Sequence, residues 1–535
     1  MKAYRLELLS LQFACFLTAL LAIYYAFGRI APRVQWVVLL VGSIVFYGIV
    51  GTWPLLSFML VTALSTWLGA RKLAGLSEQA KQARKEAKGR DEKKAVKARY
   101  VRKRRWVLFA VFAVCLGMLG YLKYWNTILF NIGLAESTTS LGIVLPLGIS
   151  FYMFASLGYV LEVYNEKLAP EGNFVRFFLF ISWFPQVIQG PINRFAEMSS
   201  QLFASRGPSW VGMRRGLLRL CYGLLKKYAI ANVLVGNYRA IIGPADGTTS
   251  APVVIIGILL YSFQMYADFS GGIDIVEGVS ELFGVEMAQN FRQPYFSTSL
   301  ANFWRRWHMS LGHWMKNYVF YPLAVCGPMR ELNRRATKLL GKQTGRTISA
   351  CISNIIVFFV VGLWHGAELH FIAWGLYNGI MIALADLFAP VFERIGKRLH
   401  IQRESVPFHA FAILRTFAVV AVGRYFDCIE SVAVGLACLK ATVTNFVPLS
   451  TVQPQLEALG VTSPNTLGFE TVALWALAVV FVVDVLYERG HDVRTELMCL
   501  RLPVRIAIYL ACGTIFAFSL RFSLGQGEAF MYANY

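Results

Sequence analysis

The amino-acid sequence predicts an all-α polytopic membrane protein with roughly ten to thirteen transmembrane or re-entrant helices. Hydrophobic residues fill 56% of the 535 positions and charged residues only 15%, whereas a soluble protein carries about 25% charged residues. Several apolar runs approach or exceed the roughly 18 residues that mark a membrane helix. They lie at about 8–27, 34–50, 106–122, 141–161, 252–267, 351–364, 371–388, 408–423, 470–486 and 503–520. No small-residue cleavage site follows the first run, so we expect it to stay as an anchor in a multi-pass protein of the cytoplasmic membrane.

Positive charge is concentrated in one stretch of the chain. Residues 71–105 hold 15 Lys and Arg against 4 Asp and Glu, which supplies +11 of the net charge of +22. Such a run can bind nucleic acid, but here membrane spans flank it. We therefore expect a helical cytoplasmic loop that obeys the positive-inside rule and contacts the lipid bilayer, with no nucleic-acid partner. Residues 326–349 form a second basic loop, which we also expect on the cytoplasmic side.

The chain shows no long internal repeat and no soluble domain, so we expect one membrane-embedded domain over residues 1–535. Its N-terminal spans cover residues 1–130 and its C-terminal spans cover residues 386–535. The nine cysteines are scattered and include no CxxC pair. This spacing favours small core residues over disulfides or a metal site.

Three stretches between the two sets of spans depart from a plain membrane helix. Pro146 and Gly148 predict a broken or kinked helix start. Residues 183–195, WFPQVIQGPINRF, place prolines, glycine and amides in an apolar neighbourhood. They are either irregular backbone, buried in protein or lining a wet cavity, or a plain extramembrane loop. Residues 210–239 predict an amphipathic basic helix on the cytoplasmic surface.

The stretch 302–322, NFWRRWHMSLGHWMKNYVFYP, gathers histidines, tryptophans and cations within an apolar chain. Read as a helix at 100° per residue, it has two sides. One arc of roughly 120° holds Trp304, Trp307, His308, Leu311, Trp314 and Met315. The other side holds Arg305, Arg306, His313 and Lys316. We therefore expect His308 to face the protein interior, where an imidazole is costly and indicates function.

A second histidine, His365, lies within the apolar segment FFVVGLWHGAELHFIAWGLYNG. The pairs 308/313 and 365/370 are spaced i,i+5, about 140° apart on a helix, and not i,i+4 as in a helical metal pair. No Cys or carboxylate stands at ligand spacing, so we expect no metal. No GxSxG motif supports a serine nucleophile. The remaining chemistry is general base catalysis, in which a buried neutral imidazole takes a proton from a hydroxyl that attacks an activated acyl group. A core histidine bonded to a backbone carbonyl is the alternative.

Carboxylates beside the run at 252–267 support a different hypothesis. Asp268, Asp274, Glu277 and Glu281 lie within 14 positions and line either a cavity or a membrane rim. If the first three relay protons, the protein is a polytopic transporter or flippase, although the chain shows no similar halves. A scaffold or receptor with structural histidines is a third hypothesis.

Taken together, the motifs resemble those of the bacterial membrane-bound O-acyltransferase family. The matching segments are AxFWRRWHMSLGxWxxxYVFxPL, GLWHG, FPQxxxGPIxRF, YxDFSGxxD and QNFRQPYF, with the C-terminal aromatic tail QGEAFMYANY. The resemblance covers residues 140–385, which we take as the catalytic core. It is strongest to the branch that contains the alginate O-acetylation protein, and the teichoic acid D-alanyl transfer protein is a more distant relative.

The resemblance implies roles for individual residues. His365 of GLWHG would be the catalytic base and His308 a second required residue, both inside a central tunnel across the membrane. Residues expected to line the tunnel or bind substrate are Asn302, Trp304, Trp307, Trp314, Trp364, Asp268 and Ser270. The cations Arg305, Arg306 and Lys316 would either hold the phosphates of a coenzyme A donor or form a positively charged rim. Gly272 and Ile273 stand where the family often has hydroxyl residues.

The resemblance also implies the reaction. An acyl group, expected to be acetyl, would leave a cytoplasmic thioester, either acetyl-CoA or an acyl-carrier protein. It would pass to a hydroxyl of an exported cell-envelope polysaccharide or to an extracytoplasmic acetyltransferase-type partner. Because a thioester is already activated, we expect no bound cofactor, and His365 needs only to hold the hydroxyl near the thioester carbon. His308 would donate to the developing oxyanion or orient the acyl group.

Overall fold

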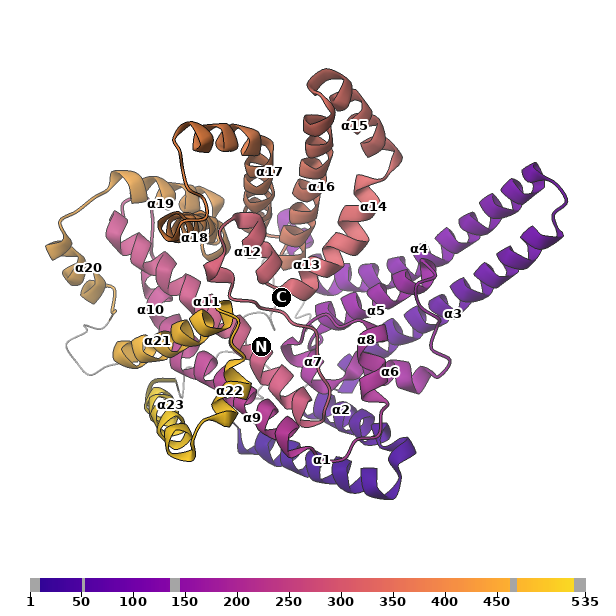
Figure 1. Cartoon of the computed structure of the whole chain (residues 1–535), viewed down its shortest axis with the longest axis horizontal. Helices are drawn as coiled ribbons and strands as arrows, with labels where there is room; N and C mark the ends of the chain where they lie inside the picture. The colour runs from indigo at the N-terminus through magenta and orange to yellow at the C-terminus, as the bar shows by residue number, and fades with distance from the viewer. Residues whose placement is uncertain (1–9, 51–52, 135–144, 462–468, 524–535) are drawn as a thin grey trace. The chain divides into compact units, whose positions relative to one another are not determined.

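The computed structural model describes residues 10–50, 53–134, 145–461 and 469–523, and within these ranges the chain forms helices and no β-strand (Figure 1). The tail QGEAFMYANY lies outside the described residues. Ten helices in the described ranges are long and apolar enough to cross a membrane, which confirms the all-α polytopic prediction. These spans are Leu11–Ile30, Pro32–Val50, Trp53–Glu86, Arg90–Phe130, Ala251–Leu282, Thr347–His365, Leu369–Arg398, Val406–Cys428, Thr471–Glu488 and Leu502–Leu520.

Contacts divide the chain into two compact units. The first unit holds the described residues up to Leu217 together with residues 276–288. Its helices are α1 (Leu11–Ile30), α2 (Trp36–Val50), α3 (Leu56–Glu86), α4 (Arg90–Asn131), α5 (Ile149–Tyr164), α6 (Phe174–Ser182), α7 (Phe184–Gln189), α8 (Phe195–Leu202) and the first turns of α9 (Trp210–Leu224). Helices α3 and α4 pack side by side as a long hairpin that carries the basic stretch 71–105 (Figure 1). This confirms the helical form predicted for that stretch.

The second unit holds the described residues of 218–275 and 289–523. Its helices are the rest of α9, α10 (Asn232–Ile242), most of α11 (Ala251–Leu282), α12 (Leu300–Arg306), α13 (Met309–Met315), α14 (Tyr321–Ala324), α15 (Gly327–Leu340), α16 (Lys342–His365), α17 (Leu369–Arg398), α18 (Val406–Cys428), α19 (Val432–Thr444), α20 (Val452–Ala458), α21 (Phe469–Glu488), α22 (Val493–Cys499) and α23 (Leu502–Ser523). Within it, α16 and α17 form an extensively packed hairpin, and α12 lies against α17 and α18.

The predicted break before α5 is present at Gly148. This residue has φ +67° in the left-handed region, which glycine adopts without the steric cost of a side chain. A Cβ added at Gly148 would lie 2.2 Å from the backbone oxygen of Val187. Glycine therefore permits both the turn into α5 and the close approach of α7.

The segment 184–193 is buried along its whole length. Asn193 Nδ2 donates to Gln186 Oε1 at 2.7 Å, and Asn193 Oδ1 accepts from the backbone N–H of Ala288 at 2.8 Å. These bonds satisfy polar groups that burial has removed from water. The interpretation as a plain extramembrane loop is therefore wrong. Residues 184–189 form the short helix α7, and residues 190–193 are irregular backbone buried in protein.

The surface helix predicted over 210–239 is wrong in its second half. Helix α9 continues into a π-helical turn, Leu225–Ala231, before α10 begins. Lys226 and Lys227 in this turn are buried. Lys227 Nζ donates to Asp268, and Lys226 Nζ donates to Asp274 and to Ser270 Oγ. A π turn cannot be predicted from a regular helical period. The period also does not show that acids of α11 compensate the charges of Lys226 and Lys227.

Loss of one partner in the Lys227–Asp268 pair should destabilise the protein. Lys227→Met leaves the Asp268 carboxylate buried without this cation, which costs about 3–5 kcal/mol, whereas replacing both partners by apolar residues is often close to neutral. We expect the melting temperature of the purified protein to fall in Lys227→Met and to recover largely in Lys227→Met/Asp268→Leu. Additive losses in the double variant would contradict a specific pairing of these two residues.

Candidate active site

The helix predicted over 302–322 is interrupted at His308. Helix α12 ends two residues before it, α13 begins after it, and His308 has φ +47° and ψ +53°. This left-handed conformation is uncommon for a residue with a side chain, and such strain is concentrated at functional sites. The prediction of one continuous helix is therefore wrong at its most important residue.

The two predicted sides of the stretch nevertheless hold. Buried residues are Trp307, His308, Leu311 and Met315, with Trp304 and Trp314 half-buried; exposed residues are Arg305, His313 and Lys316, with Arg306 half-buried. The sides persist because α12 and α13 each keep a helical period, although the chain turns between them.

Asn290, which precedes Phe291 in the QNFRQPYF segment, holds the ring of His308. Asn290 Oδ1 accepts hydrogen bonds from the backbone N–H and the Oγ–H of Ser310, at 3.1 and 2.8 Å. His308 Nδ1 lies 3.1 Å from the same oxygen. Because a backbone N–H can only donate, the amide must present its oxygen to all three groups. His308 Nδ1 therefore carries the ring proton, and Nε2 carries the lone pair.

The environment of His308 keeps its ring uncharged. The residue lies outside the ten candidate spans, yet it is buried, and burial lowers its pKa from 6.5 to about 3 because the imidazolium would lose its hydration. The edge of Phe269 in α11 packs against the ring, with centroids 4.9 Å apart. A neutral imidazole with a fixed tautomer results.

His365, the last residue of α16, is buried among aromatic rings. Its ring centroid lies 4.8 Å from Trp364, 4.9 Å from Trp374 and 6.1 Å from Phe371. The ring of Trp364 also lies 6.1 Å from His308. The two histidines, which the sequence separates by more than fifty positions, therefore contact the same indole.

Close packing of α16 and α17 brings Trp374 to His365. A Cβ added at Gly375 would lie 2.4 Å from the backbone oxygen of Phe358, so the two helices can approach this closely only at glycine. Trp374 in turn packs against Trp304 of α12, with centroids 5.4 Å apart. The indole N–H of Trp304 donates to Asn378 Oδ1 at 3.1 Å. Within the second unit, residues of α12, α16 and α17 thus form one aromatic cluster around His365, made of Trp304, Trp364, Phe371 and Trp374.

The other predicted binding residues have mixed positions. Asp268 and Ser270 are buried beside Phe269, and each bonds to a lysine of the π turn. Asn302 lies in the first turn of α12, and the ring of Trp314 packs on Tyr318, 5.3 Å away. Their roles in substrate binding stay predictions.

The cations predicted to bind donor phosphates also differ from one another. Arg306 forms a two-fold ion pair with Glu488, at 2.7 and 3.1 Å. Lys316 lies 5.7 Å from the ring centroid of Tyr321, and Arg305 is exposed. A role for these residues in holding the donor stays a prediction.

His370 fits the structural alternative that was kept open for each histidine. It is buried, and its Nδ1 donates to the backbone oxygen of Phe426 at 2.9 Å. Sequence reasoning did not assign a role to Asn290 or to Arg424, whose guanidinium pairs with Asp427 at 2.7 Å and lies 5.2 Å from the ring centroid of Trp307. A charged residue next to the apolar run 408–423 was the available signal for Arg424.

Comparisons with known proteins match the part of the chain that carries these motifs. The sequence profile of the membrane-bound O-acyltransferase family matches residues 46–414, which include Asn290, His308 and His365. The chain is 32% identical to a protein of Pseudomonas aeruginosa named probable alginate O-acetylase, over 69% of this chain and 64% of that relative. It therefore spans just under two thirds of that relative.

Two further relatives carry related names. The chain is 31% identical to a peptidoglycan O-acetyltransferase of Helicobacter pylori, over 53% of this chain and 55% of the relative. It is 26% identical to a teichoic acid D-alanyltransferase of Bacillus subtilis, over 52% of this chain and 67% of the relative. These findings confirm the resemblance that the motifs indicate.

If the site catalyses acyl transfer, Asn290→Asp should make that transfer sensitive to acid. The variant keeps an acceptor for Ser310 and His308 but adds a negative charge 3.1 Å from Nδ1, which favours the imidazolium and raises the pKa of His308 from about 3 towards the usual 6.5. If the neutral ring is the active form, transfer by membranes of the variant falls as the pH drops from about 8 to about 5.5, while the native protein shows no such loss from His308. Asn290→Ala, which removes the acceptor, should lower activity at every pH. Identical pH profiles for the native protein and Asn290→Asp would contradict this role of Asn290.

Proposed function

The chain belongs to the membrane-bound O-acyltransferase family, and on that premise we propose that it moves an acyl group from a cytoplasmic thioester to a hydroxyl outside the cytoplasm. The names of its relatives favour acetyl as the acyl group. They also favour a polysaccharide of the cell envelope as the acceptor, reached directly or through an extracytoplasmic transferase. The observation that carries the proposal is the contact of two buried histidines with the one indole of Trp364.

In this mechanism His365 is the general base. Its neutral ring takes the proton of the acceptor hydroxyl while the hydroxyl oxygen attacks the carbonyl carbon of the thioester. A new C–O ester bond forms, the C–S bond breaks, and the leaving thiolate takes the proton from the His365 imidazolium. The donor leaves as a free thiol and His365 returns to its neutral form. No covalent acyl-enzyme is needed, because the thioester is already activated.

His308 acts beside this base as a hydrogen-bond acceptor. Because Asn290 fixes the ring proton on Nδ1, Nε2 of His308 presents a lone pair. Donation from Nε2 to the developing oxyanion does not fit this tautomer. Nε2 instead accepts a hydrogen bond from a donor group of a substrate, such as the acceptor hydroxyl or an amide N–H in the arm of the thioester. This bond orients the reacting groups.

The aromatic cluster protects the donor from hydrolysis. Water that reached His365 would be activated by the same base and would cleave the thioester. The rings of Trp364, Trp374 and Phe371 surround the imidazole within 4.8–6.1 Å and leave it buried. Exclusion of water also strengthens every polar interaction at the reacting atoms.

The proton-relay function of a transporter has less support from the same unit. A relay carboxylate must gain and lose a proton, but Asp268 pairs with Lys227, and Asp274 pairs with Lys226 and with Arg219 Nε at 3.0 Å. Each of these two carboxylates is thus engaged by a cation at hydrogen-bond distance. The buried ion pairs therefore favour a structural role for these acids.

Replacement of His365 tests the proposal directly. His365→Ala removes the base and should lower the ester content of envelope polysaccharides, or acyl transfer by isolated membranes, by about 10²–10⁴-fold. His313→Ala is the matched control, because His313 lies five residues from His308 but is exposed, and it should retain native activity. Both variants must reach the membrane in native amounts. Unchanged ester content in well-expressed His365→Ala would rule out acyl transfer at this site.

A further inference from the structure

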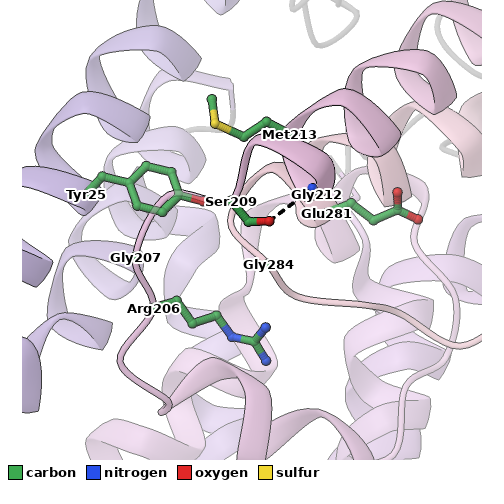
Figure 2. A pocket seen from close by; sticks show the side chains of 8 residues that line it. All are labelled: Tyr25, Arg206, Gly207, Ser209, Gly212, Met213, Glu281 and Gly284. Carbon is green, nitrogen blue, oxygen red and sulfur yellow. Dashed lines mark hydrogen bonds between the residues drawn. The ribbon is translucent and has the colours of Figure 1, made fainter. Parts of the chain in front are cut away.

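A cavity of about 210 Å³ lies in the first unit, apart from the motifs of the proposed reaction (Figure 2). Its lining residues are Tyr25, Arg206, Gly207, Ser209, Gly212, Met213, Glu281 and Gly284. We propose that this cavity binds the headgroup phosphate of a phospholipid of the cytoplasmic leaflet, with the phosphate at Arg206. The proposal rests on the membrane-spanning fold and does not depend on acyl transfer.

Arg206 is a cation held in place without an acidic partner. Its backbone oxygen accepts from the side chain of Gln35 at 2.9 Å, and its backbone N–H donates to Gln35 Oε1 at 2.8 Å. Within the part of the chain that the structure describes, its guanidinium forms no hydrogen bond and no ion pair, and its Nε is buried. A guanidinium with its donors unused is the usual partner of a phosphate in proteins.

The chain makes room for the Arg206 side chain on the opposite wall. Gly284 follows α11 with φ +74°, and a Cβ added there would lie 2.8 Å from Arg206 Cδ. Any other residue at this position would push the arginine stem aside. The backbone of Arg206 is held by Gln35, and Gly284 leaves space for the Arg206 side chain. Together these features fix the position of the guanidinium before a ligand binds.

Two further side chains complete the polar side of the cavity. Ser209 Oγ accepts from the backbone N–H of Gly212 at 3.2 Å, which leaves its hydroxyl proton for an anionic oxygen. The hydroxyl of Tyr25 donates to the backbone oxygen of Leu282 at 2.6 Å, so its ring forms a wall of the cavity. Met213 adds an apolar side chain to the lining (Figure 2).

The size of the cavity limits the ligand. The cavity is smaller than the roughly 300–1,000 Å³ of sites for drug-sized molecules, yet it has room for about seven waters at 30 Å³ each. A phosphoethanolamine group is of this size.

The cavity lies at the depth of lipid headgroups. Helices α1, α2 and α3 are successive spans joined by short connections, and α3 leads into the basic stretch 71–105, which the positive-inside rule assigns to the cytoplasm. Each span crosses the membrane once, so α3 begins on the outer side and α2 begins on the cytoplasmic side. The end of α1 at Ile30, which directly precedes α2, is therefore also cytoplasmic. Tyr25 precedes this end by five residues, about 7–8 Å along a helix.

Exposed apolar side chains flank the cavity on the chain segments that line it. Trp210 and Val211 begin α9 directly after Ser209 and are 73% and 60% exposed, and Ile30 at the end of α1 is 81% exposed. Such apolar side chains pack favourably against the acyl chains of lipids, and tryptophan is enriched at the membrane interface. A lipid covers these side chains as well as the charged groups, whereas a soluble phosphate does not.

Binding can be measured with the purified full-length protein in detergent, by thermal-shift titration with short-chain phosphatidylethanolamine. Arg206→Gln keeps a long polar side chain and removes the charge, so we expect its apparent dissociation constant to rise at least about tenfold. Arg33→Gln is the matched control, because Arg33 is an exposed cation near the same end of α1 and should bind as the native protein does.

Two results would overturn the proposal. The first is equal binding of phosphatidylethanolamine by the native protein and a folded Arg206→Gln variant. The second is displacement of the lipid by coenzyme A or inorganic phosphate, which would assign the cavity to a soluble phosphate. The lipid-binding results do not depend on whether the His365→Ala variant loses acyl transfer.

Discussion

The hydrogen bonds accepted by Asn290 tie two chain segments together around His308. The side-chain oxygen accepts from Ser310 and faces His308 Nδ1, and the backbone oxygen of Asn290 accepts from the backbone N–H of Met309 at 2.9 Å. These bonds support His308 in a left-handed conformation that its own backbone disfavours. They also settle which ring nitrogen carries the proton. The orientation of the candidate site towards a substrate depends on this one amide.

Buried ion pairs also support the surroundings of His308. Within the second unit, the lysines of the π turn pair with Asp268 and Asp274 on α11, and Phe269 between these acids packs against His308. A buried ion pair adds little net stability, because desolvation offsets most of the attraction. The ion pair instead fixes the orientation of a helix, because each acid must face its lysine partner. The pairs thereby fix the rotation of α11 and the position of Phe269, and π turns are often found at functional sites.

Several features could be predicted from residue order alone because they depend on local rules. The inward side of 302–322 follows from helical periodicity, and it survives the break at His308 because each short helix keeps that period. Gly148 and Pro146 predict the break before α5 from backbone sterics. The partners of Lys226 and Lys227 could not be predicted, since the matching acids are more than forty positions away. Asn290 was missed for a similar reason, because an amide in a loop gives no sign of which ring it will hold.

The sequence by itself determined that the chain spans the membrane repeatedly. It also predicted that the basic stretch lies in the cytoplasm and that His308 and His365 carry the chemistry. These conclusions rest on hydrophobicity, charge and motif, which are written in consecutive residues. Only the tertiary structure decided that both histidines contact Trp364, that Nε2 of His308 carries the lone pair, and that Arg206 is left with its donors unused. Each of these depends on which distant groups meet after folding, because hydrogen bonds, ring contacts and charge pairs act through distances in space and not through positions along the chain.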